Sequence, residues 1–512
     1  MLSTAIVVLA PAVAAGAQLG NDDAIHIANR LAFGGNLDDR IQIRTNYSGW
    51  LNAQLHPTTI PDPDVDMLFP PGFQIFDSAE LQRQQFARAL ISNRRLQEVM
   101  TYFWERHFNT SLGQVANRIA MTYGLSGGVA NGMATQLEWL SNAAYRANAL
   151  TSFRNLLLWT SLSPAMLLYL DGDANRGCGG NENYGREFLE LFTMGHRNAS
   201  NNNLPNYSQA DVVSAAGCFS GWILTLANWP YVTFSTDAAD HCQSDQTLLG
   251  TTIFNVGNGS NQLVDLVYHA AGHPATKDFM CRKLMRFFLS EAGGSTALLN
   301  QMTAAWGNDG NLPAVLGALF TSAEFLGTAN RWALASTPFE RVVMWQRVWN
   351  GSLRRADTLA YETDPALVTH KVEAMRLAAM SLGENLFFFP APDGYSGNAD
   401  EQISASAAFD SWNYRARIRA GIYEPEDQPG NFYPDDPTVV LALVTGGSTN
   451  AVTVATRLLE HLYGANPHPL DVQQVTNAIG PGALNPANAF DYAARCADGA
   501  AAAGTFVKAQ LK

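Results

Sequence analysis

The chain has 512 residues, a hydrophobic fraction of 47%, a charged fraction of only 15% and a formal net charge of −13. The apolar fraction excludes an intrinsically disordered chain, because it suffices for a packed core. The negative charge argues against a general binder of nucleic acid or anionic membranes, since both are themselves anionic. The length permits one large domain or two to three ordinary ones.

The N-terminal segment has features of an export signal. Residues 4–15 are apolar and rich in small side chains, and Ala15-Gly16-Ala17 fits the cleavage pattern, although the basic region that usually precedes it is missing. We therefore expect residues 1–17 to be a signal peptide and the mature protein to be secreted or periplasmic. No later apolar run reaches about 18 residues, so no membrane span is expected.

The body of the chain is predicted to be mainly α: a large multi-helix globular domain with long loops and a small β-hairpin or extended arm. Apolar spacing, capping residues and glycines define the expected helices. They cover residues 21–33 and 38–55, two helices within 78–108 that meet near 92–93, two within 114–159, one from 182, one at 208–219, and 273–288, 296–306, 312–325, 337–349, 364–382 and 401–422.

The segments between these helices are predicted to be irregular. Residues 58–75 hold several prolines and no period, and we expect a surface loop there. Residues 221–234 alternate weakly and predict the hairpin, and 387–395 (FFFPAPDGY) predict an aromatic loop that borders a cleft. A Pro/Asp-rich break at 424–437 divides a domain at 18–425 from a helical extension at 426–512, which we expect to pack on the same core.

An acidic loop at 171–182 (DGDANRGCGGNE) fits the EF-hand calcium template in part. Its oxygen-bearing side chains fall at template positions 1, 3, 5 and 12, which predicts a Ca²⁺ site. The ligands would be Asp171, Asp173, Asn175 and Glu182. One position departs from the template, because Arg176 stands where it requires glycine. The alternative is an ordinary turn rich in Asx residues and glycine whose carboxylates cap the next helix.

The helix after this loop concentrates charge on one face. At about 100° per residue, Glu182, Arg186, Glu187 and Glu190 share one side of it. Glu187 and Glu190 are three residues apart, and repulsion between them would raise one pKa, as a general acid requires. Arg186 opposes this effect and is a candidate for substrate binding. The alternative is a solvated face with a Glu182–Arg186 ion pair.

Two histidines are candidates for acid/base or metal-binding roles. His107 ends an apolar helical stripe, where a histidine is commonly a satisfied core residue. His241 follows Asp240 on a loop, and Asp240 is a further candidate for substrate binding. Trp222 lies in the predicted hairpin, where an aromatic ring either stacks on a sugar or packs in the core. Arg146 and Arg154 are predicted to pair with carboxylates.

Five cysteines (Cys178, Cys218, Cys242, Cys281 and Cys496) allow one or two disulfides in an oxidising compartment. A bridge at Cys178 would fasten the acidic loop. Their pairing cannot be deduced from the sequence, and the odd number leaves at least one thiol unpaired in a monomer.

Several segments occur in an order that resembles a known family. They are 26–34 (HIANRLAFG), 103–108 (FWERHF), 164–171 (PAMLLYLD), 181–195 (NENYGREFLELFTMG) and 219–222 (FSGW). Together they resemble domain-of-unknown-function family 1800, which is bacterial and mostly exported, over residues 25–425. The resemblance implies no settled activity. It implies a partner from domain-of-unknown-function family 1501. Two positions depart from the family: Gly185 replaces alanine, and Cys242 follows His241 where aspartate is usual.

Missing motifs narrow the chemistry. No G-x-G-x-x-G, P-loop, H-E-x-x-H or G-x-S-x-G is present, so no nucleotide cofactor is expected. We therefore expect an exported hydrolase that acts on an extracellular polymer, preferably a polysaccharide, through Glu187, Glu190, His107 and His241. The alternative is a non-enzymatic, Ca²⁺-stabilised binding or assembly protein of the cell envelope.

Overall fold

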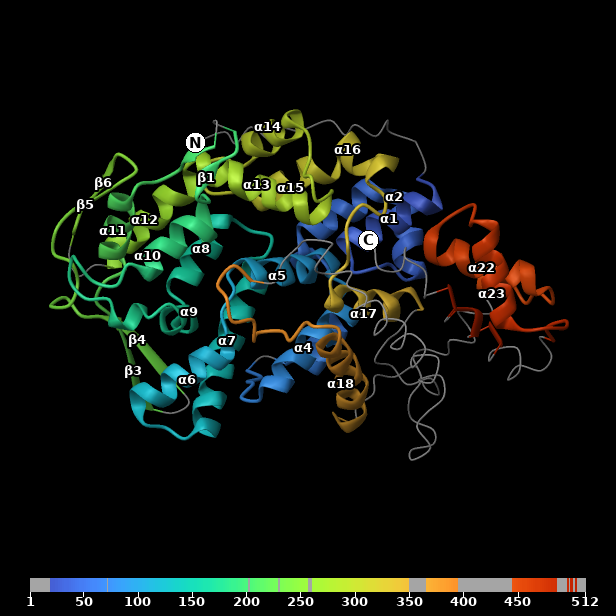
Figure 1. The fold of residues 1–512 in the computed structure, drawn as a ribbon, viewed down its shortest axis with the longest axis horizontal. Helices are drawn as coiled ribbons and strands as arrows, with labels where there is room; N and C mark the ends of the chain where they lie inside the picture. The colour runs from blue at the N-terminus through green and yellow to red at the C-terminus, as the bar shows by residue number, and fades with distance from the viewer. Residues whose placement is uncertain are drawn as a thin grey trace.

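Apolar residues at helical spacing build a mainly α protein, as the sequence predicts (Figure 1). The computed structural model describes residues 19–349 apart from 71, 201–202, 229–230 and 257–259. Beyond them it describes residues 365–394, 444–485, 495–496, 498–500 and 502–503. The predicted signal peptide, the predicted helix at 401–422 and the break at 424–437 lie outside these residues. No described helix combines the length and apolar character needed to span a bilayer.

The first half of the chain alternates helices with short capped turns. The elements are α1 (Asn21–Leu31), α2 (Leu37–Leu55), the 3₁₀ turn η1 (Pro57–Thr59), α3 (Pro63–Leu68), α4 (Ser78–Ile91), α5 (Arg95–His107), α6 (Leu112–Tyr123), α7 (Gly127–Asn148), α8 (Phe153–Ser161), α9 (Pro164–Tyr169), the 3₁₀ turn η2 (Gly172–Ala174), α10 (Asn183–Glu187) and the π-helix η3 (Phe188–Thr193).

The sequence predictions for this half need two corrections. The segment 58–75 is not wholly a loop, because Pro63 starts a helical turn at the position where proline is favoured. The segment 114–159 forms three helices, counting α6 from Leu112, instead of two. Gly124 ends α6 in the left-handed conformation at φ 63°, and the Ser152 side chain caps α8. The predicted break at 92–93 is confirmed.

The second half follows the predicted order closely. Its described helices are α11 (Gln209–Cys218), α12 (Ser260–Gly272), α13 (Pro274–Phe288), α14 (Thr296–Ala305), α15 (Leu312–Phe320), α16 (Ala323–Leu326), the 3₁₀ turn η4 (Thr328–Asn330), α17 (Pro338–Val348), α18 (Pro365–Ser381), α22 (Ala451–Tyr463) and α23 (Pro469–Ile479). Residues 312–325 form two helices instead of the predicted one, because the Ser322 hydroxyl accepts a hydrogen bond from the Phe325 amide and starts a new one.

The described strands form three antiparallel pairs. They are β1 (Arg197–Asn198) with β2 (Leu204–Pro205), β3 (Trp222–Asn228) with β4 (Tyr231–Thr236), and β5 (Gln246–Leu248) with β6 (Thr251–Ile253). The β3–β4 pair confirms the predicted hairpin. Its register begins at Trp222 opposite Thr236 and shifts between Thr225 and Asn228.

One large hydrophobic core runs from α1 to Phe387, and α5 lies near its middle (Figure 1). Trp104 and Phe108 are almost fully buried there. A second cluster joins α22 and α23 to Trp345 and Val348 of α17. The His461 ring and its backbone also bond to Val348 and Arg40, so the C-terminal helices are anchored to the main body.

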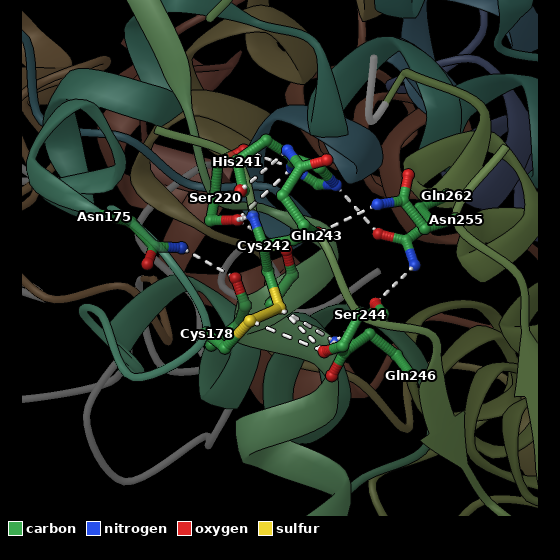
Figure 2. The surroundings of a disulfide bond; sticks show 12 residues. Asn175, Cys178, Ser220, His241, Cys242, Gln243, Ser244, Gln246, Asn255 and Gln262 are labelled. Atoms are coloured by element: carbon green, nitrogen blue, oxygen red, sulfur yellow. Dashed lines mark hydrogen bonds between the residues drawn. A yellow bond between two sulfur atoms is a disulfide. The ribbon is translucent and has the colours of Figure 1, made fainter. Parts of the chain in front are cut away.

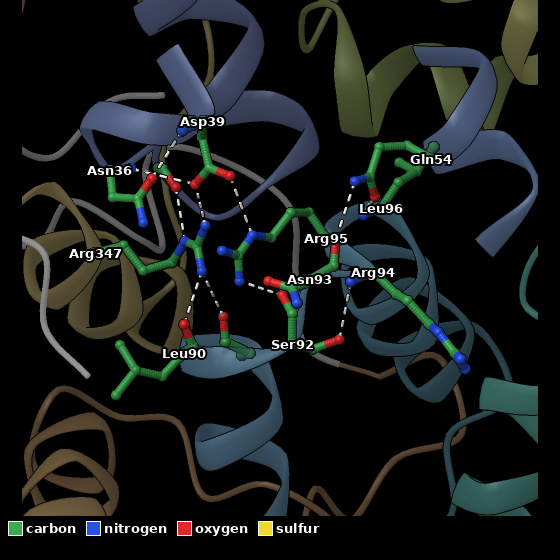
Figure 3. Close-up of polar contacts among 12 residues, drawn as sticks. Asn36, Asp39, Gln54, Leu90, Ser92, Asn93, Arg94, Arg95, Leu96 and Arg347 are labelled. Atoms are coloured by element: carbon green, nitrogen blue, oxygen red, sulfur yellow. Dashed lines mark hydrogen bonds and ion pairs between the residues drawn. The ribbon is translucent and has the colours of Figure 1, made fainter. Parts of the chain in front are cut away.

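A buried ionic network fixes how the N-terminal helices meet α17 (Figure 3). The Arg347 guanidinium lies 2.6 Å from one oxygen of Asp39, and the Arg95 Nε lies 3.3 Å from the other. Arg347 also donates to the carbonyls of Gly34 and Leu90 at 2.8 Å. Burial opposes ionisation of Asp39, but the two arginines outweigh it and hold its pKa below the ordinary value.

Candidate functional site

The C-terminal turn of α5 sends three consecutive polar side chains into different parts of the interior. Neighbouring residues on a helix point about 100° apart, so Glu105, Arg106 and His107 cannot share partners. Glu105 meets Glu138 of α7, Arg106 meets Glu384, and His107 meets Lys283 of α13. The family-like segment FWERHF therefore places three charged or titratable groups inside the main core.

His107 is a neutral ring that holds a lysine. It is 1% exposed, and its Nε2 lies 3.1 Å from the Phe192 carbonyl oxygen, which can only accept a hydrogen bond. The proton therefore sits on Nε2, and Nδ1 accepts from the Lys283 Nζ at 2.8 Å. Burial, then Lys283, lowers the pKa of His107 well below its usual range. His107 thus positions Lys283 and is not itself charged at neutral pH.

Lys283 is enclosed by protein yet keeps a partly solvent-accessible surface. Burial and the nearby Arg106 lower the pKa of Lys283 to about 8, while Asp393 acts in the opposite direction. Arg106 donates to the Tyr102 hydroxyl at 2.7 Å and lies 3.1 Å from Glu384. Lys283 is therefore a cation that can lose its proton near neutral pH, whereas Arg106 is a fixed one.

Two carboxyl groups share one buried position beside this cluster. Glu105 and Glu138 are hydrogen-bonded to each other, and burial raises the pKa of both. Asn142 donates to Glu105 at 2.7 Å, and the Thr110 hydroxyl donates to Glu138 at 2.6 Å. Two carboxylates in contact cannot both ionise at low cost, so the pair retains a proton.

Glu187 is the predicted acidic residue with the most altered environment. It is half-buried, and burial, followed by repulsion from Glu190, raises its pKa against the opposing effect of Arg186. Asp393 raises it further and also raises the pKa of Tyr169, so these three groups lie within electrostatic reach of one another. Because Asp393 also acts on Lys283, it connects Glu187 with the cluster at the end of α5.

The loop at 385–394 brings Asp393 to this place, as Figure 1 shows for the orange segment beside α5. The Tyr169 hydroxyl donates to the Pro390 carbonyl at 2.8 Å, and the Asn109 amide donates to the Ala391 carbonyl at 2.7 Å. Gly394 has a φ of 73°, and a Cβ there would lie 2.7 Å from the Arg106 carbonyl oxygen. The predicted aromatic loop is therefore a strap across the end of α5.

Glu187 and Glu190 do not follow the ordinary helical face that the sequence predicts. α10 ends at Glu187, and residues 188–193 form a π-helix in which the Thr193 hydroxyl donates to the Phe188 carbonyl at 2.7 Å. A π-turn is wider than an α-turn, so the 100° spacing fails beyond Glu187. Glu190 accepts a hydrogen bond from the Tyr207 hydroxyl at 2.8 Å.

Ion pairs with arginine and a buried hydrogen bond hold the acidic loop at 171–182 in place. Arg118 of α6 lies 3.1 Å from Asp171 and 2.9 Å from Asp173. Asn175 is 1% exposed and donates to the Ala216 carbonyl at 2.8 Å. Its Oδ1 has no hydrogen-bond partner among the described residues. No group of three or more His, Cys, Asp or Glu side chains suited to a metal was found in the described part of the chain.

Glu182 closes the loop at the surface. Arg186 donates to it at 3.1 Å and Gln209 at 2.6 Å, so the predicted Glu182–Arg186 pair forms. Both side chains are about 40% exposed, which makes this an ordinary surface pair. Arg186 therefore faces Glu182 and α11, on the solvent side of the helix.

A disulfide between Cys178 and Cys242 ties the acidic loop to the segment that carries His241 (Figure 2). Arg176 forms an ion pair with Asp240, and the Gly177 amide donates to the Asp240 carbonyl at 2.7 Å. Cys242 thus replaces the usual aspartate with a covalent crosslink. Cys218 and Cys281 are free and buried, and Cys496 is also buried.

His241 and Trp222 are part of the scaffold around this crosslink. His241 is 2% exposed, and its two ring nitrogens each lie 2.8 Å from an acceptor, the Ser220 carbonyl and the Gln262 side-chain oxygen (Figure 2). Trp222 is 6% exposed and belongs to the main core. Asp240 faces Arg176. His241, Trp222 and Asp240 therefore lie near the disulfide and not beside Glu187.

The structure therefore joins some predicted site residues and separates others. His107 and Glu187 are connected through Lys283 and Asp393, whereas Glu105 and Glu138 form a separate buried pair; none of these last four residues was a candidate from the sequence. Glu105 stood inside the recognised FWERHF segment and could have been found there, because charge within an apolar helical stripe is a signal of a buried polar group. Lys283 belongs to the basic face of the expected helix at 273–288 and Asp393 to the expected aromatic loop, but nothing local distinguishes either residue from its neighbours.

The departure at Gly185 has a packing explanation. A Cβ at this position would lie 2.7 Å from the Ala216 amide nitrogen and 2.9 Å from the Val212 carbonyl oxygen. Real side chains do not tolerate such contacts, so alanine would force α10 and α11 apart. Gly185 therefore sets the close approach of these helices beneath Glu187.

Comparison with known proteins identifies a family without a known activity. A comparison with curated proteins and a comparison with solved structures each gave no match. A family model described as "Protein of unknown function (DUF1800)" matches residues 26–496. The resemblance in the sequence ended at residue 425. The family match continues beyond that residue and includes the helices of the C-terminal part. The chain belongs to the DUF1800 family of proteins of unknown function.

Proposed function

We propose that this protein is an exported hydrolase that cleaves an extracellular polymer, preferably a polysaccharide, with Glu187 as the proton donor. The observation that carries the proposal is the raised pKa of the half-buried Glu187 beside a second carboxylate from a distant segment, Asp393. A raised pKa keeps a carboxyl group protonated to higher pH, and a protonated carboxyl group can protonate a leaving oxygen. The predicted signal peptide supports export.

The two carboxylates divide the chemistry in this proposal. Glu187 donates a proton to the glycosidic oxygen, and Asp393 acts as the second carboxylate, which activates water or attacks the sugar carbon. The sequence predicts Glu190 as the second catalytic carboxylate. We assign this role to Asp393, because Glu190 already accepts a hydrogen bond from the Tyr207 hydroxyl. A partner from another segment can also avoid the close spacing of two residues on one helix.

The test compares Glu187→Gln with the wild-type protein on a panel of bacterial polysaccharides, with released reducing ends as the readout. We expect the variant to lose roughly 100-fold or more of the rate, as removal of a general acid does. Glu80→Gln is the control, because Glu80 is a surface residue of α4 paired with Arg83. A wild-type protein that releases no reducing ends overturns the hydrolase, and full activity of Glu187→Gln overturns the role of Glu187.

A second candidate is a non-enzymatic envelope protein that Ca²⁺ stabilises and that acts in binding or assembly. The observation that favours it is the buried Asn175 Oδ1 without a hydrogen-bond partner among the described residues, next to Asp171 and Asp173. Oxygen ligands of this kind suit Ca²⁺. In this case the acidic loop holds the fold, a protein of domain-of-unknown-function family 1501 is the proposed partner, and Glu187→Gln has no effect on partner binding.

A further inference from the structure

Lysine is rare in this chain, and one of the two lysines whose side chains the structure describes is enclosed by protein. Five of the 32 basic residues are lysines, at positions 277, 283, 371, 508 and 512, and the other 27 are arginines. Arginine keeps its charge under all ordinary conditions, whereas a lysine can give up its proton when it is enclosed. Buried ion pairs in this chain use arginine, as at Arg347 and Arg106. Position 283 instead holds lysine, which can lose a proton and become a neutral amine.

The contacts of Lys283 favour the neutral amine. The His107 Nδ1 accepts one N–H at 2.8 Å, and the hydrogen bond from Nε2 to the Phe192 carbonyl keeps that nitrogen unprotonated. A neutral acceptor orients the amine and contributes no negative charge that would hold the ammonium form. The Phe279 ring centroid lies 6.0 Å from the Nζ, at the outer limit of a cation–π contact, so this ring favours the ammonium form only weakly.

The charged groups that act on Lys283 come from two other elements. Arg106 of α5 disfavours the ammonium form, and Asp393 of the strap favours it. Burial outweighs Asp393, and the pKa of Lys283 is lowered to about 8. Lys283 also keeps a partly accessible surface. Lysines that react with carbonyl groups have this combination of enclosure and a neighbouring cation.

We propose that Lys283 is a reactive amine that captures an aldehyde or ketone group of a ligand as a Schiff base. The Nζ lone pair attacks the carbonyl carbon, and a proton passes from the nitrogen to the carbonyl oxygen to give a neutral carbinolamine. Loss of that oxygen as water, with a second proton, leaves a C=N bond to Nζ. No oxidant or reductant is needed. This activity does not depend on hydrolysis, so it stands or falls separately from the role of Glu187.

The experiment treats the full, folded chain with glyceraldehyde and sodium cyanoborohydride, which reduces a Schiff base to a stable amine. Peptide mass spectrometry then measures the rate of modification at each lysine. Lys277 is the internal control, because it lies on α13 only six residues earlier and is also partly exposed. At pH 7.5 we expect Lys283 to react at least roughly ten-fold faster than Lys277, since a lower pKa leaves more neutral amine.

The pH dependence supplies a second readout. The rate at Lys283 should level off slightly above pH 8, where an ordinary lysine amine is still largely protonated. Lys283→Arg, which keeps the positive charge, should abolish the fast-reacting site and leave the modification of Lys277 unchanged. Modification of Lys283 that is no faster than that of Lys277 overturns the proposal, whether the cause is poor access or an ordinary amine.

Discussion

Two acidic regions of this protein have opposite surroundings. The loop at 171–182 holds most of its acidic side chains near the surface, where Arg118 and Arg186 meet them. The cluster at the end of α5 encloses Glu105, Glu138 and Glu384 in the main core, where hydrogen bonds and one proton compensate for lost water. The density of acidic residues in the sequence identified the first region, while burial gives the second its unusual chemistry.

This difference shows why a charged run is a poor guide to a reactive site. Exposed carboxylates are screened by water, so their ion pairs contribute little to stability. An enclosed carboxyl or amine has its pKa moved by burial and by each neighbouring charge. The raised pKa of Glu187 and the lowered pKa of Lys283 both arise at the boundary between the two regions, where enclosure begins.

The largest difference between the regions should appear in stability. Glu384 is 1% exposed and accepts hydrogen bonds from the Tyr102 hydroxyl at 2.6 Å, the Phe339 amide at 2.8 Å and Arg106 at 3.1 Å. Glu384→Ala leaves a buried guanidinium without its carboxylate, and we expect unfolding free energy to fall by about 3–5 kcal/mol. Denaturant unfolding followed by circular dichroism measures the loss.

The matched substitution in the loop is Asp171→Asn. Asn tolerates the left-handed φ of 54° at this position, so the change removes only the charge that faces Arg118. We expect a loss below about 1 kcal/mol, as for other exposed ion pairs. Equal losses in Glu384→Ala and Asp171→Asn would contradict the comparison.

A smaller effect should appear in the pH dependence of stability. The pKa of Glu105 is raised in the folded state, so the folded protein binds more protons than the unfolded chain. Stability from this group is present below its ordinary pKa of about 4 and is lost as the pH rises through the raised value. Glu105→Gln removes this decline, which reaches about 1.4 kcal/mol per pH unit at most for one proton.

Denaturant unfolding at pH 5, 6, 7 and 8 compares Glu105→Gln with the wild-type protein. We expect the variant to gain relative stability steadily toward pH 8, because titrations common to both proteins cancel in the difference. Glu80→Gln, on the surface of α4, should run parallel to the wild-type protein. A constant difference between Glu105→Gln and the wild-type protein would show that Glu105 is ionised in the fold.

Much of the architecture could be predicted from local sequence. Helix caps such as Ser208 and Thr337, and the proline at position 338, define element ends that depend only on nearby residues. The π-helix at 188–193 could not be predicted in this way, because it depends on how the segment is packed and not on its periodicity. That one local change overturned the predicted helical face of Glu187 and Glu190.

The candidate site was predictable only in part for a related reason. Glu187 and His107 were found because each stands in a distinctive local pattern. Asp393 and Lys283 become neighbours of that site through the strap over α5 and the packing of α13, which are long-range features. His107 matches the alternative of a satisfied core histidine, and only its contacts with Phe192 and Lys283 show that the ring is neutral.

The smallest predicted effect concerns Ca²⁺. A calcium ion at the acidic loop would have to displace Arg118 from Asp171 and Asp173, because the same oxygens serve both. We therefore expect 5 mM Ca²⁺ or a chelator to shift the melting temperature of the wild-type protein by less than about 1 °C. Arg118→Ala frees both carboxylates, so Ca²⁺ should stabilise that variant measurably, in proportion to RT ln(1 + [Ca²⁺]/Kd). A larger Ca²⁺ shift in the wild-type protein that Glu182→Ala abolishes would contradict this prediction, because the loop would then bind the ion in preference to the arginine.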